Sequence, residues 1–168
     1  MGLAHGPSRR YSNTGGIAML SNNLVRMIES HTEQITADVI HRLREDPELP
    51  NLKKLPDAEL RSWAGHILRH LGDWLSESDE SQIASCYEGL GKLRFEEHVP
   101  LHESVRNFQR LKDTMVVYIR NQGVHQTTME LYAEEELEHR LARFFDRMIY
   151  HMVRGYEGAR EHMEVAVR

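Results

Sequence analysis

The chain has 168 residues, of which 40% are hydrophobic and 28% charged, a composition typical of one soluble globular domain. Its formal charge of −5 argues against nucleic acid and against an anionic membrane surface as partners. No apolar run is long enough to predict a membrane span, and a single cysteine, Cys86, allows no intramolecular disulfide and fits a reducing, cytoplasmic compartment.

The N-terminal part of the chain changes character near residue 19. Residues 1–18 are rich in Gly, Ser, Arg and Asn, which predicts a disordered leader before one helical domain over residues 19–168. Apolar residues at helical spacing predict a first helix over about residues 21–45. That helix should end before the segment DPELPNLKKLP, because its prolines cannot continue a helix.

A second helix is predicted after this segment, with Asp57 as its N-cap. Its apolar stripe includes Trp63 and Trp74, whose spacing of about three helical turns places both on one face. Both tryptophans are therefore expected to be largely buried.

Two further helices follow, over about residues 80–97 and from Pro100 to about residue 122. In the first of these, Gly89 and Gly91 either weaken the helix or allow a neighbouring helix to approach closely. Proline is favoured at the start of a helix, which suits the position of Pro100.

The last third of the chain has the strongest pattern. From Thr127 or Thr128 onward, apolar residues recur at spacings of three and four, with acidic residues at the start and basic residues toward the end, an order that suits the helix dipole. The sequence therefore predicts an all-α fold: five main helices in an antiparallel bundle or a globin-like stack, with a long C-terminal helix.

Several histidines were considered as ligands. His66 and His70 have the i,i+4 spacing that can share a metal ion, but no glutamate follows the first histidine, so the zincin pattern is absent. A ring packed at the edge of the core is the favoured interpretation. The pair Glu136 and His139 is similar to one half of a di-iron motif, but no second half exists, so no metal site is predicted.

A haem pocket requires an axial histidine among apolar residues. His70 and His151 are the two histidines next to apolar stripes, so they are the candidate cofactor-binding residues if a cofactor is bound. Neither context is distinctive. The sequence therefore predicts no cofactor and no catalytic residue.

The final helix offers apolar side chains beyond those that a simple core needs. Met148, Met152 and Tyr156 are accordingly predicted to form the interface of a symmetric homodimer. Residues after Gly158 have few apolar anchors and are predicted to form a connector, which is either frayed or paired with a second chain; a plain C-terminal tail is the alternative.

Three segments carry a family resemblance. They are HRLREDPELPNLKKLPDAELRSWAGHILRHLGDWL, KLRFEEHVPLHESVRNFQRLKDTM and YAEEELEHRLARFFDRMIYHMVRGYEGAR. Together they resemble the N-terminal domain of the RsbRD type, in the RsbT co-antagonist family of bacterial stress signalling. Similar domains are used as input modules of some bacterial sensor histidine kinases.

The resemblance implies a helical, usually dimeric input domain placed before a STAS domain or a kinase core, and related to globins without haem. No STAS segment or kinase nucleotide-binding motif follows the long helix in this sequence, so an excised input domain and a stand-alone relative both remain open. The resemblance brings no agreed ligand residues.

These observations predict a non-enzymatic signalling input domain. A signal or partner would change helix packing, and the final helix would pass that change to a STAS or histidine kinase output module. The first alternative is a globin-like sensor that binds haem or another small molecule; the second is a metal-dependent enzyme built on Glu and His.

Overall fold

A computed structural model describes residues 14–76, 80–122 and 127–166. All regular structure in these ranges is helical, which confirms the predicted all-α fold. The helices are α1 Thr14–Ser30, α2 Thr32–Glu45, the short 3-10 helix η1 Leu52–Lys54, α3 Asp57–Arg69, α4 Leu71–Ser76, α5 Glu80–Glu96, α6 Leu101–Gln122 and α7 Thr128–Ala166.

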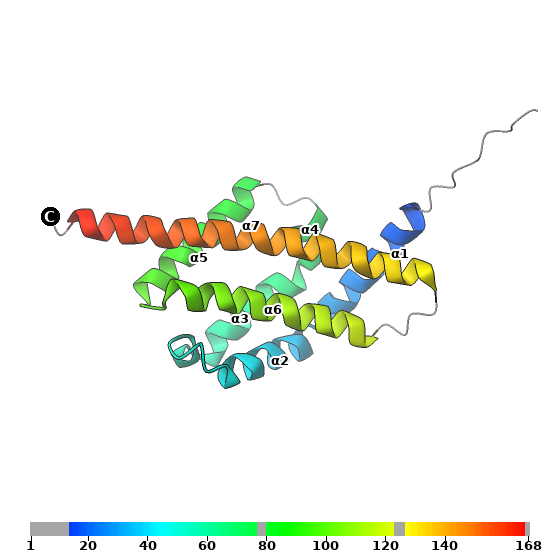
Figure 1. Ribbon diagram of the computed structural model, residues 1–168, viewed down its shortest axis with the longest axis horizontal. Coiled ribbons are helices and arrows are strands. Elements are labelled where there is room, and N and C mark those ends of the chain that lie inside the picture. Colours follow the sequence, from blue (N-terminus) through cyan, green and yellow to red (C-terminus); the bar gives the residue numbers. More distant parts are fainter. Residues whose placement is uncertain (1–13, 77–79, 123–126, 167–168) are drawn as a thin grey trace, which may run out of the picture.

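The long helix α7 runs the length of the molecule and organises the other helices (Figure 1). It packs against α5, α1 and α6, and α6 lies beside it in the opposite direction. Its buried stripe includes Leu141, Phe145 and Met148, all with no exposed surface. Among the described residues, no helix combines the length and apolar character needed to cross a membrane.

Two predicted helices are each divided in two, because polar side chains near the break bond to backbone groups. Between α1 and α2, the Ser30 hydroxyl donates to the carbonyl of Met27 (2.9 Å) and the Thr32 hydroxyl to that of Glu29 (2.8 Å). Such local bonds compete with the helical pattern. Between α3 and α4, the free N–H of Gly72 donates to the Glu29 carboxylate at 2.8 Å.

The predicted leader overlaps a helix, because α1 already begins at Thr14. Residues 14–18 are therefore helical, while residues 1–13 lie outside the described residues. Both tryptophans were expected to be largely buried. Trp74 is, with 8% of its surface exposed, whereas Trp63 is half-buried at the edge of the same core.

A second, smaller core holds the proline-containing loop between α2 and α3. Its buried side chains are Ile40, Leu43, Leu49, Leu52, Leu60 and Val99. The carboxylate of Glu103 on α6 is 1% exposed and accepts hydrogen bonds from the backbone N–H groups of Asn51 (3.0 Å) and Leu52 (2.8 Å), and from the Asn51 amide (2.7 Å). One buried side chain thus fixes this loop to α6.

We expect Glu103→Ala to lower the free energy of unfolding by about 2–4 kcal/mol, because it leaves these donors without their acceptor. Urea denaturation followed by circular dichroism measures this change. Glu136→Ala, at an exposed position of α7, is the control and should change stability by less than about 0.5 kcal/mol. Equal effects of the two substitutions would contradict the role assigned to Glu103.

Candidate functional site

Helices α5 and α7 touch at two glycines, Gly91 and Gly155. At no other glycine in the described ranges does the backbone of a neighbouring helix come so close. A Cβ atom at Gly91 of α5 would overlap the carbonyl oxygen of Met152, and one at Gly155 of α7 would overlap the carbonyl of Glu88. The two backbones therefore touch directly. Of the two possibilities that the sequence left open for Gly91, the close approach is the one observed.

The glycines occupy positions where the apolar stripes predict a core side chain. Gly91 continues the spacing of the buried residues Ile83 and Tyr87 along α5, and Gly155 continues that of Met148 and Met152 along α7. A glycine at a position where the apolar stripe predicts a large side chain therefore indicates a close helix contact. Such a contact was one of the two possibilities considered for Gly91, but it was not considered for Gly155.

A polar network borders the same contact. The His151 ring is 3% exposed, with Nε2 2.5 Å from the Glu80 carboxylate and Nδ1 3.2 Å from the Glu88 carboxylate, both on α5. Arg147 also pairs with Glu80 at 2.6 Å, and Arg154 lies 3.6 Å from Glu88. Both ring nitrogens of His151 thus face carboxylates of α5.

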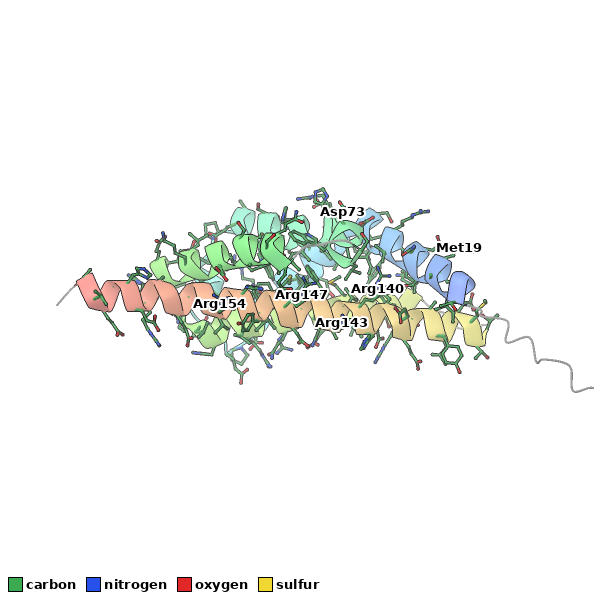
Figure 2. All side chains as sticks on the ribbon, turned by 90° about the horizontal axis from the view of Figure 1, so that it is seen from above. Met19, Asp73, Arg140, Arg143, Arg147 and Arg154 are labelled. Atoms are coloured by element: carbon green, nitrogen blue, oxygen red, sulfur yellow. The ribbon has the colours of Figure 1, made fainter. Side chains whose placement is uncertain are left out.

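Four arginines, Arg140, Arg143, Arg147 and Arg154, follow one another along α7 (Figure 2). Their spacing of three, four and seven residues places them on one side of the helix. Arg140 reaches away from α5, toward the Ser21 hydroxyl (3.3 Å) and the Leu75 carbonyl (3.5 Å). The arginine side of α7 thus makes polar contacts with several helices. The apolar stripe of α7 lies on a different side and packs into the core.

The two candidate cofactor ligands differ in environment. His70 is exposed at the end of α3 and lies 3.8 Å from the Asp73 carboxylate, so it is outside any apolar pocket. His151 is buried, but carboxylates occupy both of its nitrogens, which leaves neither free to bind haem iron. The sequence places both histidines next to apolar stripes, but its pattern does not show the acidic side chains of α5 that face His151.

Two of the three predicted interface residues lie in the core of the chain, and the third is half-buried. Met148 and Met152 have no exposed surface, because they fill the core. Tyr156 is half-buried and packs edge-on against Phe95 of α5, with ring centroids 5.4 Å apart. The apolar surplus predicted for α7 is thus taken up by α5 at these positions.

Other sequence candidates remain separate. His66 and His70 have ring centroids 5.8 Å apart on the surface of α3 and at its end. Within the described ranges, no three His, Cys, Asp or Glu side chains converge in a way that could hold a metal ion. The Cys86 thiol is free and exposed.

We expect Gly91→Ala to destabilise the protein by about 1–3 kcal/mol or more, because the added methyl group forces the α5 and α7 backbones apart. Gly89→Ala is the matched control two residues away, where an added Cβ meets no atom within 4 Å. It should stabilise by about 0.4–1 kcal/mol through lower flexibility of the unfolded chain. Urea denaturation measures both; a Gly91→Ala protein as stable as wild type would contradict the close approach.

The polar network should also make stability depend on pH. Hydrogen bonds from His151 and Arg147 hold the pKa of Glu80 below its ordinary value of 4.5. A carboxylate with a lowered pKa stabilises the folded state above the unfolded pKa, and that contribution is lost as the pH falls through the folded pKa. We therefore expect wild type to exceed Glu80→Gln in stability near neutral pH, and this difference to narrow as the pH falls below about 4.5.

The measurement is the urea midpoint of both proteins between about pH 6 and pH 3. Glu96→Gln is the control, since the one ion pair of Glu96 among the described residues is an exposed contact of 3.9 Å with Lys92. A surface pair of this kind contributes little, so Glu96→Gln should follow wild type at every pH. A difference between wild type and Glu80→Gln that does not change with pH would contradict the assignment.

Comparison with known proteins identifies the relatives of this chain. The family described as "RsbT co-antagonist protein rsbRD N-terminal domain" matches residues 33–167, which include all of α3, α4, α5, α6 and α7. No curated protein and no solved structure gives a significant match. The matched region covers most of the 168 residues, and the chain therefore belongs to the family of RsbRD-type N-terminal domains of stress-signalling proteins.

Proposed function

We propose that this domain is a non-enzymatic, homodimeric input module that transmits a signal through α7 to a STAS or histidine kinase output module. Membership of a family of N-terminal domains in stress signalling supports a role upstream of an output. The observation that carries the proposal is the course of the apolar stripe of α7 beyond the other helices.

The apolar stripe that α7 buries in the core continues, at the same helical spacing, along the part of α7 that is exposed to solvent. Inside the body it contains Met148, Met152 and Tyr156, and the last ring contact with α5 is that of Tyr156 with Phe95. At the same spacings of three and four, it continues as Ala159, Met163 and Ala166. Met163 is 54% exposed, so this part of the stripe has no cover in a single chain.

The shape of the molecule agrees with an apolar stripe that extends beyond the other helices. The C-terminal end of α7 projects past the other helices (Figure 1). Residues 157–166 correspond to about 15 Å of helix, and residues 160–166 are exposed. A helix end with no packed face tends to fray, and a second helix packed along it would hold it in place.

A second copy of the same chain fits this need. Two parallel α7 ends related by a two-fold axis would place Ala159, Met163 and Ala166 against their own equivalents, and small or flexible apolar residues suit such a seam. A helix that is continuous from the core to this seam would couple the packing of α7 on α5 to the geometry of the dimer. The seam, rather than Met148 and Met152, is then the interface.

We expect Met163→Lys to weaken the dimer, because it places a charge at the centre of the seam. Glu161→Lys is the matched control, since residue 161 is equally exposed but lies on another side of the helix. Sedimentation at tens of micromolar protein should give a dimer for wild type and Glu161→Lys, and a larger monomer fraction for Met163→Lys. A monomeric wild-type protein at these concentrations would contradict the homodimer.

Transmission is tested in the same chain fused to a histidine kinase core, with one to four alanines inserted after Gly158. Each residue added to a continuous helix turns the distal part by about 100°. Autophosphorylation should therefore vary periodically with insert length, and Ala159→Pro, which breaks the helix, should remove the variation. Kinase activity that is indifferent to every insertion would leave α7 as a plain tail.

A further inference from the structure

A small polar pocket lies on the arginine side of α7, beside the end of α4. Its volume is about 140 Å³, and side chains of these two helices line it: Trp74, Leu75, Arg140, Arg143, Phe144 and Arg147. Sites for whole small molecules usually exceed about 300 Å³, so this pocket suits one compact group. Three of its lining residues are arginines, which indicates that the group is an anion.

The three arginines reach one pocket because of their places on the helix. At about 100° per residue, they fall within roughly 60° of one another around α7. Figure 2 shows them along a single stretch of that helix. The apolar part of the wall is well packed, since Trp74 is 8% exposed and stacks on Phe144 with ring centroids 5.7 Å apart.

Two of the arginines carry charge that no described carboxylate neutralises. Arg143 is exposed and forms no ion pair with a described residue. Among the described residues, Arg140 donates only to neutral oxygens, a hydroxyl at 3.3 Å and a carbonyl at 3.5 Å. Glu135 and Glu136 line a different pocket beside Arg140 without pairing with it. The pocket thus has two unpaired positive charges, although the whole chain is formally negative.

We propose that this pocket binds a phosphate group, either as inorganic phosphate or as the terminal phosphate of a small phosphomonoester. Planar guanidinium groups match phosphate oxygens, so Arg140 and Arg143 would each donate charge-assisted hydrogen bonds. A phosphate carries nearly two negative charges at neutral pH, which balances these two arginines, whereas a carboxylate carries one. Arg147 would line the wall and keep its pair with Glu80 at 2.6 Å.

The test titrates inorganic phosphate into the full chain labelled with nitrogen-15, with sodium chloride holding the ionic strength at about 0.15 M. The two tryptophans give two indole N–H resonances, which Trp63→Phe assigns. Phosphate should move the Trp74 resonance saturably and the Trp63 resonance much less, because only Trp74 lines the pocket. Arg143→Gln should weaken the affinity by about tenfold or more, through the loss of a charge-assisted hydrogen bond.

Arg154→Gln is the matched control. It removes the same charge from the same side of α7, but residue 154 does not line the pocket and lies about 16 Å along the helix from Arg143. At this ionic strength that distance is about twice the screening length, so the affinity should change by less than about twofold. Equal losses in Arg143→Gln and Arg154→Gln would mean a general charge effect and would overturn the proposal.

Two further ligands define the chemistry of the bound group. Acetate carries one negative charge and should bind at least about tenfold more weakly than phosphate. Glycerol 3-phosphate distinguishes the two sources of the phosphate group: tighter binding than that of inorganic phosphate supports a phosphomonoester, and weaker binding supports the free ion. Binding of acetate as tight as that of phosphate would overturn the proposal.

The acidic residues Glu77 and Asp79 follow α4 in the chain and lie outside the described residues. A variant that combines Glu77→Gln with Asp79→Asn tests whether they take the place of the anion. Saturable binding by wild type supports the proposal, whereas binding by this variant alone, or by neither protein, would overturn it. Because the readout is binding to the domain itself, these results are separate from those of the fusion experiment.

Discussion

The contact of the α5 and α7 backbones at Gly91 and Gly155 is the constraint on which the rest of the structure depends. Direct backbone contact brings the two helices closer than side chains would allow, and it sets where every other residue of α5 stands relative to α7. The Glu80 and Glu88 carboxylates reach the buried His151 ring because of this spacing. A larger residue at either glycine would move α5 outward and leave a buried histidine without its acceptors.

Helix α5 carries two contact surfaces. Tyr87 packs on the core rings of Trp74 and Phe108, whereas Glu88 and Gly91 contact α7. Adjacent residues on a helix point about 100° apart, so one helix can carry both surfaces. Tightly packed interfaces of this kind shift as units rather than deform gradually, so a movement of α5 in the core would also move its contact with α7.

The sequence predicts the helical content and the main stripes well, because apolar spacing reports which face of each helix is buried. It misses the breaks at residues 31 and 70, which depend on bonds from Ser30, Thr32 and the distant Glu29 to backbone groups. It also gives no sign of the carboxylates that face His151, since they come from a helix more than sixty residues away in the chain. One-dimensional patterns identify a face, but they do not identify what is packed against it.

The apolar surplus of α7 illustrates the same limit and also indicates how the helix could act. The stripe contains more apolar residues than one core needs, yet the first of them, Met148 and Met152, are covered by the chain itself. The stripe then passes through the partly buried Ala159 to the exposed residues Met163 and Ala166. Since the two parts share one register on one unbroken helix, any rotation of α7 against α5 turns the exposed seam by the same angle. A change in core packing that rotates α7 therefore also turns the exposed part of its stripe, as long as the helix between them stays intact.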